Sequence, residues 1–120
     1  MMLVDTSVWV DHLRRGNPQL EELLEATQVV CHRFIIGELA CGNLRKRKQI
    51  LAYLSRLPSA GFATHDEVME LVQARRLMGT GIGWVDAHLL AASLLARVPL
   101  WTMDRSLASV ARQLDVSAEQ

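Results

Sequence analysis

The sequence has little cysteine, no net charge and no long hydrophobic run, and each absence excludes a class of protein. Two cysteines in 120 residues cannot make a disulfide-stapled scaffold, and Cys31 and Cys41 lack the C-x-x-C spacing of a zinc knuckle. Thirteen basic residues against 13 acidic ones argue against a protein that holds nucleic acid by bulk positive charge alone. The most apolar stretch, residues 87–96, is too short to span a bilayer.

The remaining composition is that of a chain that folds by itself. Half of the residues are hydrophobic and 22% are charged, which excludes intrinsic disorder. A chain of this size buries roughly two-thirds of its unfolded surface, so it needs no disulfide or structural metal. We expect one domain over residues 1–120 and no signal peptide, because Met1–Val4 has neither a basic nor a long apolar segment. Both cysteines are predicted to be buried free thiols, which suits the reducing cytoplasm.

Short apolar runs alternate with helical periods along the chain. Four runs are predicted to be strands: residues 3–4, 28–31, 62–63 and 99–102. Helices are predicted after a cap at Thr6 or Ser7, after Asn17-Pro18, and over residues 34–41, 44–57, 64–78, 85–97 and 106–114. This alternation predicts an α/β fold with a mostly parallel sheet of four to five strands and helices on both faces.

Four acidic residues stand out from the others by their positions. Asp5 closes the first predicted strand, Asp104 follows the last one, and Asp86 opens a helix after a glycine-rich loop. Glu38 lies in a helix among apolar neighbours, which is unusual for an acid that faces no partner. In open α/β sheets ligands bind at the carboxyl ends of the strands, so these four side chains are candidates for one site.

Carboxylates that converge on one point repel each other, unless some stay protonated or a cation lies between them. Oxygen ligands select Mg²⁺ or Mn²⁺, and the four histidines share no spacing that would suit zinc. A magnesium ion held by a few carboxylates commonly serves phosphate chemistry. Taken singly, Asp86 and Asp104 are equally well explained as helix caps, so the hypothesis depends on the whole set.

Four segments in order resemble the motifs of PIN-domain ribonucleases, and of VapC-type toxins in particular. They are LVDTSVW at 3–9, the Glu38-Leu39 pair, DAHLLAA at 86–92 and LWTMDRSL at 100–107. The resemblance covers the chain from Leu3 to about Val116. It implies a PIN-like α/β/α sandwich and a metal-dependent endoribonuclease that cleaves RNA by attack of activated water, leaving a 5′-phosphate and a 3′-hydroxyl.

The resemblance also assigns roles, which we carry over as expectations. Asp5, Asp86 and Asp104 would hold Mg²⁺ or Mn²⁺, and Glu38 would complete the catalytic set by orienting the attacking water. Thr6 and Thr102 would donate hydrogen bonds to the carboxylates. The expected partners are an RNA substrate, a VapB-like antitoxin that covers the acidic pocket, and a second copy of the chain in a homodimer. No membrane partner is expected.

Other readings of the sequence stay open at this point. A housekeeping RNA-processing nuclease of the same fold and a non-catalytic acidic-pocket binding module both fit the acids. A response-regulator receiver would need a lysine after a late strand, and the only lysines are Lys46 and Lys48. A phosphatase of the haloacid dehalogenase type would need a D-x-D motif, and this chain has Asp5-Thr6-Ser7 in its place.

Several further features have a structural and a functional interpretation. The basic run Arg45, Lys46, Arg47 and Lys48 is either a solvated helix start or a contact to the RNA backbone. The loop 79–83 has no nucleotide-binding spacing and is interpreted as a flexible approach to Asp86.

The aromatic and apolar side chains are ambiguous in the same way. We expect the larger rings to pack in the core or at a subunit contact rather than to stack on bases: these rings are Trp9, Phe34, Trp84 and Trp101. His88 is expected to be structural. Tyr53-Leu54 and Leu71-Val72 are candidates for a dimer face or a partner groove.

The neutral charge balance hides an asymmetry if the four acids form one pocket. Nine acidic residues then remain against 13 basic ones outside it. The sequence therefore predicts an acidic centre inside a mildly basic shell, with weak, salt-sensitive binding of RNA.

Overall fold

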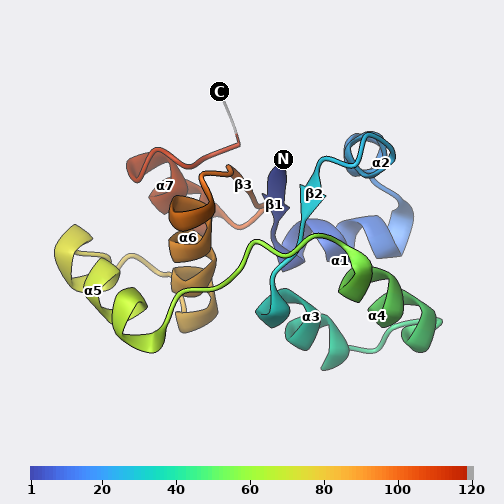
Figure 1. The fold of residues 1–120 in the computed structure, drawn as a ribbon, viewed down its shortest axis with the longest axis horizontal. Coiled ribbons are helices and arrows are strands. Elements are labelled where there is room, and N and C mark those ends of the chain that lie inside the picture. Colours follow the sequence, from blue (N-terminus) through green and yellow to red (C-terminus); the bar gives the residue numbers. More distant parts are fainter. Residues whose placement is uncertain (119–120) are drawn as a thin grey trace.

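The computed structural model describes residues 1–118 and has a small parallel sheet at its centre. Its elements are β1 (Met2–Val4), α1 (Thr6–Arg15), α2 (Pro18–Glu25), β2 (Val29–Val30), α3 (Arg33–Ala40), α4 (Arg47–Arg56), α5 (His65–Arg75), α6 (Trp84–Ala96), β3 (Leu100–Trp101) and α7 (Arg105–Gln113). Helices α1, α2 and α4 lie to the right of the strands in Figure 1, α3 lies below them, and α5, α6 and α7 lie to the left. The α/β class and the parallel sheet predicted from the sequence are confirmed.

The sheet has the strand order β2-β1-β3, and both pairings are parallel. Leu3 of β1 pairs with Val30 on one side and with Leu100 on the other. Isolated parallel bridges, Cys31 to Ser59 and Leu100 to Ser117, extend the two outer strands. Within the described residues the sheet therefore has three strands with one further bridged segment at each edge.

The core forms where the sheet meets its helices. Leu3 and Val4 of β1 are fully buried, as are Leu89 and Leu90 of α6. Burial of large apolar side chains on a central strand and on a helix of the left layer ties the two halves together, at roughly 1.5–3 kcal/mol for each side chain. No helix within residues 1–118 combines the length and the apolar character needed to cross a membrane.

Some local predictions were wrong, and the structure gives the reason. Residues 62–63 form no strand: the edge bridge occurs at Ser59, and Ala63 is buried instead against α5 and α6. Helix α1 is capped by Asp5 and not by Thr6 or Ser7. Helix α4 starts only at Arg47, because Lys46 before it adopts the left-handed conformation at φ 54°.

The burial of Cys41 and Leu54 differs from expectation, and Trp84 is excluded from the core. Cys31 is buried as predicted, but Cys41 is exposed at the carboxyl end of α3. Leu54 is only 1% exposed, so it cannot contribute to a dimer face. Trp9 is in the core, whereas Trp84 is 41% exposed and does not belong to it.

Candidate active site

Asp5 lies at the carboxyl end of the central strand and is almost completely buried. Its side chain is 5% exposed, and its carboxylate accepts hydrogen bonds from the hydroxyl groups of Ser7 and Thr102, each at 2.7 Å. The backbone N–H of Ser7 donates a third, longer bond of 3.3 Å. All three bonds go to Oδ2, so Oδ1 receives no hydrogen bond from residues 1–118 and is left for another ligand.

The two hydroxyl groups join the end of β1 to the loop after β3. Thr102 Oγ1 accepts from the backbone N–H of Asp104 at 3.0 Å, and Ser7 Oγ accepts from that of Met103 at 2.9 Å. Each hydroxyl therefore accepts from the loop and donates its proton to Asp5. This network fixes the relative position of Asp5 and Asp104, which are 99 residues apart in the sequence.

Asp104 and Asp86 are held by the first turns of their helices. Asp104 caps α7, with Oδ2 accepting from the Leu107 N–H at 2.9 Å, and its side chain is exposed. Asp86 is the third residue of α6, and its Oδ2 accepts from the Gly83 N–H at 3.1 Å. Carboxylates are favoured at helix N-termini, and each of these side chains accepts a backbone N–H group at its own helix start.

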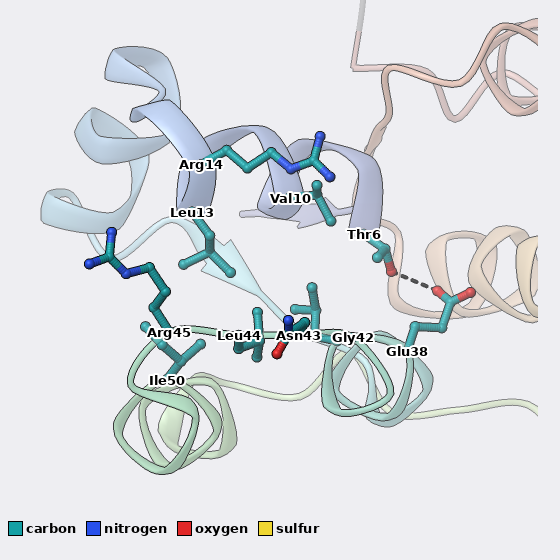
Figure 2. Close-up of a pocket in the computed structure, with 11 residues that line it drawn as sticks. Thr6, Val10, Leu13, Arg14, Glu38, Gly42, Asn43, Leu44, Arg45 and Ile50 are labelled. Carbon is teal, nitrogen blue, oxygen red and sulfur yellow. Dashed lines mark hydrogen bonds between the residues drawn. The ribbon is translucent and has the colours of Figure 1, made fainter.

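Glu38 approaches the same region from α3. Its Oε1 accepts a hydrogen bond of 2.6 Å from the Thr6 hydroxyl, at the start of α1 (Figure 2). The carboxylate is exposed, although its helix neighbours Ile35 and Leu39 are buried. Glu38 thus faces α1 and solvent, which explains an acid in an otherwise apolar helix.

The charges of the other three carboxylates act on Asp86. Its pKa lies above the ordinary value, first because of partial burial and then because of the negative charges of Asp5, Asp104 and Glu38. The hydrogen bond from Gly83 acts in the opposite direction. The fold therefore brings the predicted acids within electrostatic range of one side chain.

This donor set fits a divalent cation by its chemistry. Carboxylate oxygens are hard ligands, one oxygen of Asp5 is free, and a cation would relieve the repulsion that raises the pKa of Asp86. Within residues 1–118 no three Asp, Glu, His or Cys side chains lie close enough together to bind one ion directly. Mg²⁺ needs no such cluster, because it commonly keeps several waters and takes only one or two protein carboxylates.

Ser7 is the site residue that sequence reasoning missed. We considered it only as a helix cap, whereas its hydroxyl binds Asp5 and the loop after β3. Its position two residues after an aspartate at a helix start allows the Asp5 contact. The contact to Met103 depends on the pairing of β1 with β3, so no local pattern reveals it.

A groove of about 470 Å³ runs from Glu38 along the space between α1, α3 and α4 (Figure 2). Aliphatic side chains form much of its lining: Val10, Leu13, Leu39, Leu44 and Ile50. Arg14 and Arg45 also line it, with Arg45 at the end away from Glu38. Of the predicted basic run, Arg45 thus borders the groove, and all four members are exposed.

The comparisons with known proteins agree with this geometry. The pattern of the PIN domain family matches residues 2–113. Over 118 residues the chain is 43% identical to Ribonuclease VapC32 of Mycobacterium tuberculosis, in strain CDC 1551 / Oshkosh and equally in strain ATCC 25618 / H37Rv. The match covers 98% of this chain and 95% of each relative. The chain therefore belongs to the PIN-domain family, among its VapC-type ribonucleases.

Proposed function

We propose that this protein is a divalent-metal-dependent endoribonuclease, with Mg²⁺ or Mn²⁺ as its ion, and that it acts as the toxin of a toxin–antitoxin pair. One observation carries the enzymatic part: the hydroxyl groups of Ser7 and Thr102 join Asp5 to the loop that carries Asp104, at the carboxyl edge of the sheet. Asp86 lies within electrostatic range of this pair and of Glu38, since burial first and then these three charges raise its pKa. Such a set of carboxylates at the carboxyl edge of a sheet is suited to binding a cation. The relation to ribonucleases of the VapC type supports RNA as the substrate.

Each acid has a task in the proposed reaction. Asp5, with one free oxygen, and the helix-start residues Asp86 and Asp104 would hold the ion, either directly or through bound water. When bound, the ion would activate water and neutralise charge on the phosphoryl oxygens. Glu38 is exposed and oriented by Thr6, so its carboxylate can accept a proton from the attacking water. Thr102 and Ser7 act as positioning residues, because their hydroxyl groups hold Asp5.

The proposal is tested by RNA cleavage with Mg²⁺, with EDTA, and with Asp5→Asn and Asp104→Asn. Both aspartates are helix caps, and asparagine caps a helix equally well, so these variants lose charge without losing the cap. We expect at least about a hundredfold slower cleavage in either variant and none in EDTA. Asp66→Asn, on the exposed surface of α5, is the control. Undiminished cleavage in EDTA would overturn the metal site.

For the antitoxin we propose a VapB-like protein, one segment of which lies in the groove between α1, α3 and α4. The aliphatic lining suits an apolar peptide face, and the groove ends at Glu38, where a basic residue of that segment would meet the acidic centre. Induced expression of the chain should arrest growth, and co-expression of the neighbouring reading frame should restore it. Harmless expression of an active nuclease would favour a housekeeping role.

We further propose a cytoplasmic homodimer that contacts the RNA backbone through residues 45–48. These four residues are basic and exposed, so they can neutralise phosphates. Replacing two of them, Lys46 and Lys48, by Gln should lower the slope of log affinity against log salt by about one to two units. An unchanged salt slope would show that residues 45–48 are only a solvated surface and do not contact RNA. Sedimentation of the protein would test the homodimer.

A further inference from the structure

Two pairs of side chains in contact lie exposed at the starts of α3, α5 and α6. Arg33 places its guanidinium 4.5 Å from the centre of the Phe62 ring, and the rings of His65 and Trp84 are 5.1 Å apart. Phe62 is 56% exposed and Trp84 is 41% exposed. We call Arg33, Phe62, His65 and Trp84 the ring surface. Exposed rings that gather on one surface, rather than singly, mark candidate interaction sites.

The ring surface is held in place by buried aromatic contacts. His88 packs against Phe34 and against Trp84 with nearly perpendicular rings, each pair 4.7 Å apart. His88 itself is 5% exposed, so the indole of Trp84 rests on a buried side chain. The surface is thus a supported platform whose outer rings remain accessible.

The platform adjoins the acidic centre through two helices. Trp84 and Asp86 both lie in the first turn of α6, on different faces of the helix. The link to the acids runs through His88, which contacts both Trp84 and Phe34, because Phe34 lies four residues before Glu38 on the same face of α3. An RNA strand with one phosphate at the acids would therefore bring a neighbouring nucleotide to these rings.

We propose that the ring surface stacks unpaired nucleobases next to the cleaved phosphate, with Trp84 as the main contact, and so selects single-stranded RNA. This inference rests on the proposed ribonuclease function and adds the part of the substrate that is recognised. Alternating aromatic and cationic side chains are the usual platform for single strands, because every base has a π-face and guanidinium groups attract phosphates and rings. The aliphatic groove beyond Glu38 lacks such rings among its lining residues.

The test compares RNA binding by the wild-type protein and by Trp84→Ala, Trp84→Phe and Tyr53→Ala, in EDTA to prevent cleavage. Tyr53 is a matched control, since it is an aromatic residue with 40% exposure on α4. The probes are a labelled single-stranded oligoribonucleotide and an abasic oligomer of equal length. We expect Trp84→Ala to bind the base-bearing probe about 5- to 150-fold more weakly, the range of base–aromatic stacking. Trp84→Phe should retain most of the affinity, and Tyr53→Ala should be unchanged.

The abasic probe and fluorescence separate stacking from other effects. The abasic oligomer should bind equally to the wild type and to Trp84→Ala, and only the base-bearing oligomer should quench tryptophan emission. Trp9 is buried and Trp101 is half-buried, so quenching reports mainly on Trp84. An equal loss of affinity for both probes, or no loss for either, would overturn the proposal.

Two further measurements separate the stacking proposal from the nuclease proposal and from a role of the rings in a dimer contact. With Mg²⁺ present, Trp84→Ala should raise KM and leave kcat nearly unchanged, as expected for a residue that binds substrate away from the reacting atoms. If the wild type cleaves no RNA but still shows base-dependent binding, the nuclease proposal fails and the ring surface stands. If Trp84→Ala instead converts a dimer to a monomer with unchanged RNA affinity, the rings cover a second copy and the stacking proposal is wrong.

Discussion

Each half of the molecule supplies two of the four carboxylates, but the two halves hold them in different ways. On the side of α1 to α4, Asp5 and Glu38 are held chiefly by hydroxyl groups, from Thr102 and Ser7 for Asp5 and from Thr6 for Glu38. On the side of α5 to α7, Asp86 and Asp104 are held by backbone N–H groups of their own helix starts.

The difference matters because the two kinds of contact have different ranges in sequence. The helix-start contacts span three residues, whereas the Thr102–Asp5 and Thr6–Glu38 contacts span 97 and 32. The surfaces beside the acids differ too: an aliphatic groove adjoins Glu38, and exposed rings adjoin Asp86. The acidic centre therefore has two halves. In the locally determined half, contacts within one helix start hold Asp86 and Asp104, and in the tertiary half, contacts between distant segments hold Asp5 and Glu38.

The largest effect should come from a charge placed in the groove. Leu44→Glu should weaken binding of the VapB-like antitoxin about a hundredfold or more, because the new carboxylate would lose its water against an apolar peptide face. RNA cleavage should stay near the wild-type rate, as Leu44 is half-buried in the loop before α4 and away from the acids. Isothermal calorimetry measures the first and a cleavage assay the second. Leu95→Glu, on the exposed side of α6, is the matched control, and an equal loss there would contradict a specific groove.

Removal of one hydroxyl from the tertiary half should have the next largest effect. Thr102→Val keeps the shape of the side chain but leaves the Asp104 N–H without its acceptor and Asp5 with one donor fewer. We expect about 10- to 100-fold slower cleavage and a loss of about 1–3 kcal/mol in unfolding free energy. Ser55→Ala, which removes an exposed hydroxyl bonded within α4, should change neither by much. Full activity of Thr102→Val would show that Ser7 alone suffices to position Asp5.

The locally determined half depends on one glycine in the loop before α6. Gly81 has φ +91°, and a Cβ at this position would lie 2.8 Å from Ser106 Oγ at the start of α7. Gly81→Ala should therefore cost about 1–3 kcal/mol of stability in denaturant unfolding. Gly37→Ala in α3 is a control of opposite sign: open space surrounds that position, so alanine should stabilise by about 0.5–1 kcal/mol. A similar response of both variants would contradict the close approach.

The close approach of Gly81 to Ser106 adds a packing contact to the sequence interpretation of this loop. Flexibility of the segment that leads to Asp86 stays a prediction. Because Gly81 packs directly on the first turn of α7, it fixes the helix start that carries Asp86 relative to the one that carries Asp104.

The smallest expected effect concerns the charge of Asp86 itself. Its pKa is raised on folding, so ionisation disfavours the folded state, and the destabilisation grows as pH rises above the ordinary aspartate value of 3.8. In metal-free buffer at pH 7, Asp86→Asn should therefore raise the midpoint of thermal unfolding by about one to a few degrees. The gain should vanish near pH 3, where the wild-type carboxyl is protonated. A lower midpoint at pH 7 would show that the Gly83 hydrogen bond outweighs the repulsion.

A second titrating group contributes in the opposite pH direction. His32 is fully buried at the start of α3, and burial lowers its pKa to about 4, with the neighbouring His88 and Arg33 adding to the shift. Its folded pKa lies below the unfolded value, so stability from this group is complete above about pH 6.5 and is lost as pH falls toward 4. Unfolding studies of Asp86→Asn must therefore compare variants at equal pH.

Much of the fold and part of the site could be predicted from sequence because their causes are local. Asn17-Pro18 and Thr64 with Glu67 start helices α2 and α5 as their capping patterns predict. The positions of Asp5 and Asp104 at strand ends follow from the short apolar runs that precede them. The extent of α5 does not follow in this way: apolar spacing continues to Met78, but Arg76 adopts a left-handed conformation and ends the helix at Arg75.

The sequence by itself determined the family, the α/β class and the four candidate acids. Motifs, hydrophobic periodicity and helix caps depend only on residues that are close together in the sequence. Only the tertiary structure decided that Ser7 joins Asp5 to the loop after β3, and that Trp84 stays exposed while Leu54 is buried. The physical reason is that hydrogen bonds and burial between distant segments depend on strand pairing and helix packing. Those contacts exist only once the parallel sheet has brought residues 5, 86 and 104 to one edge.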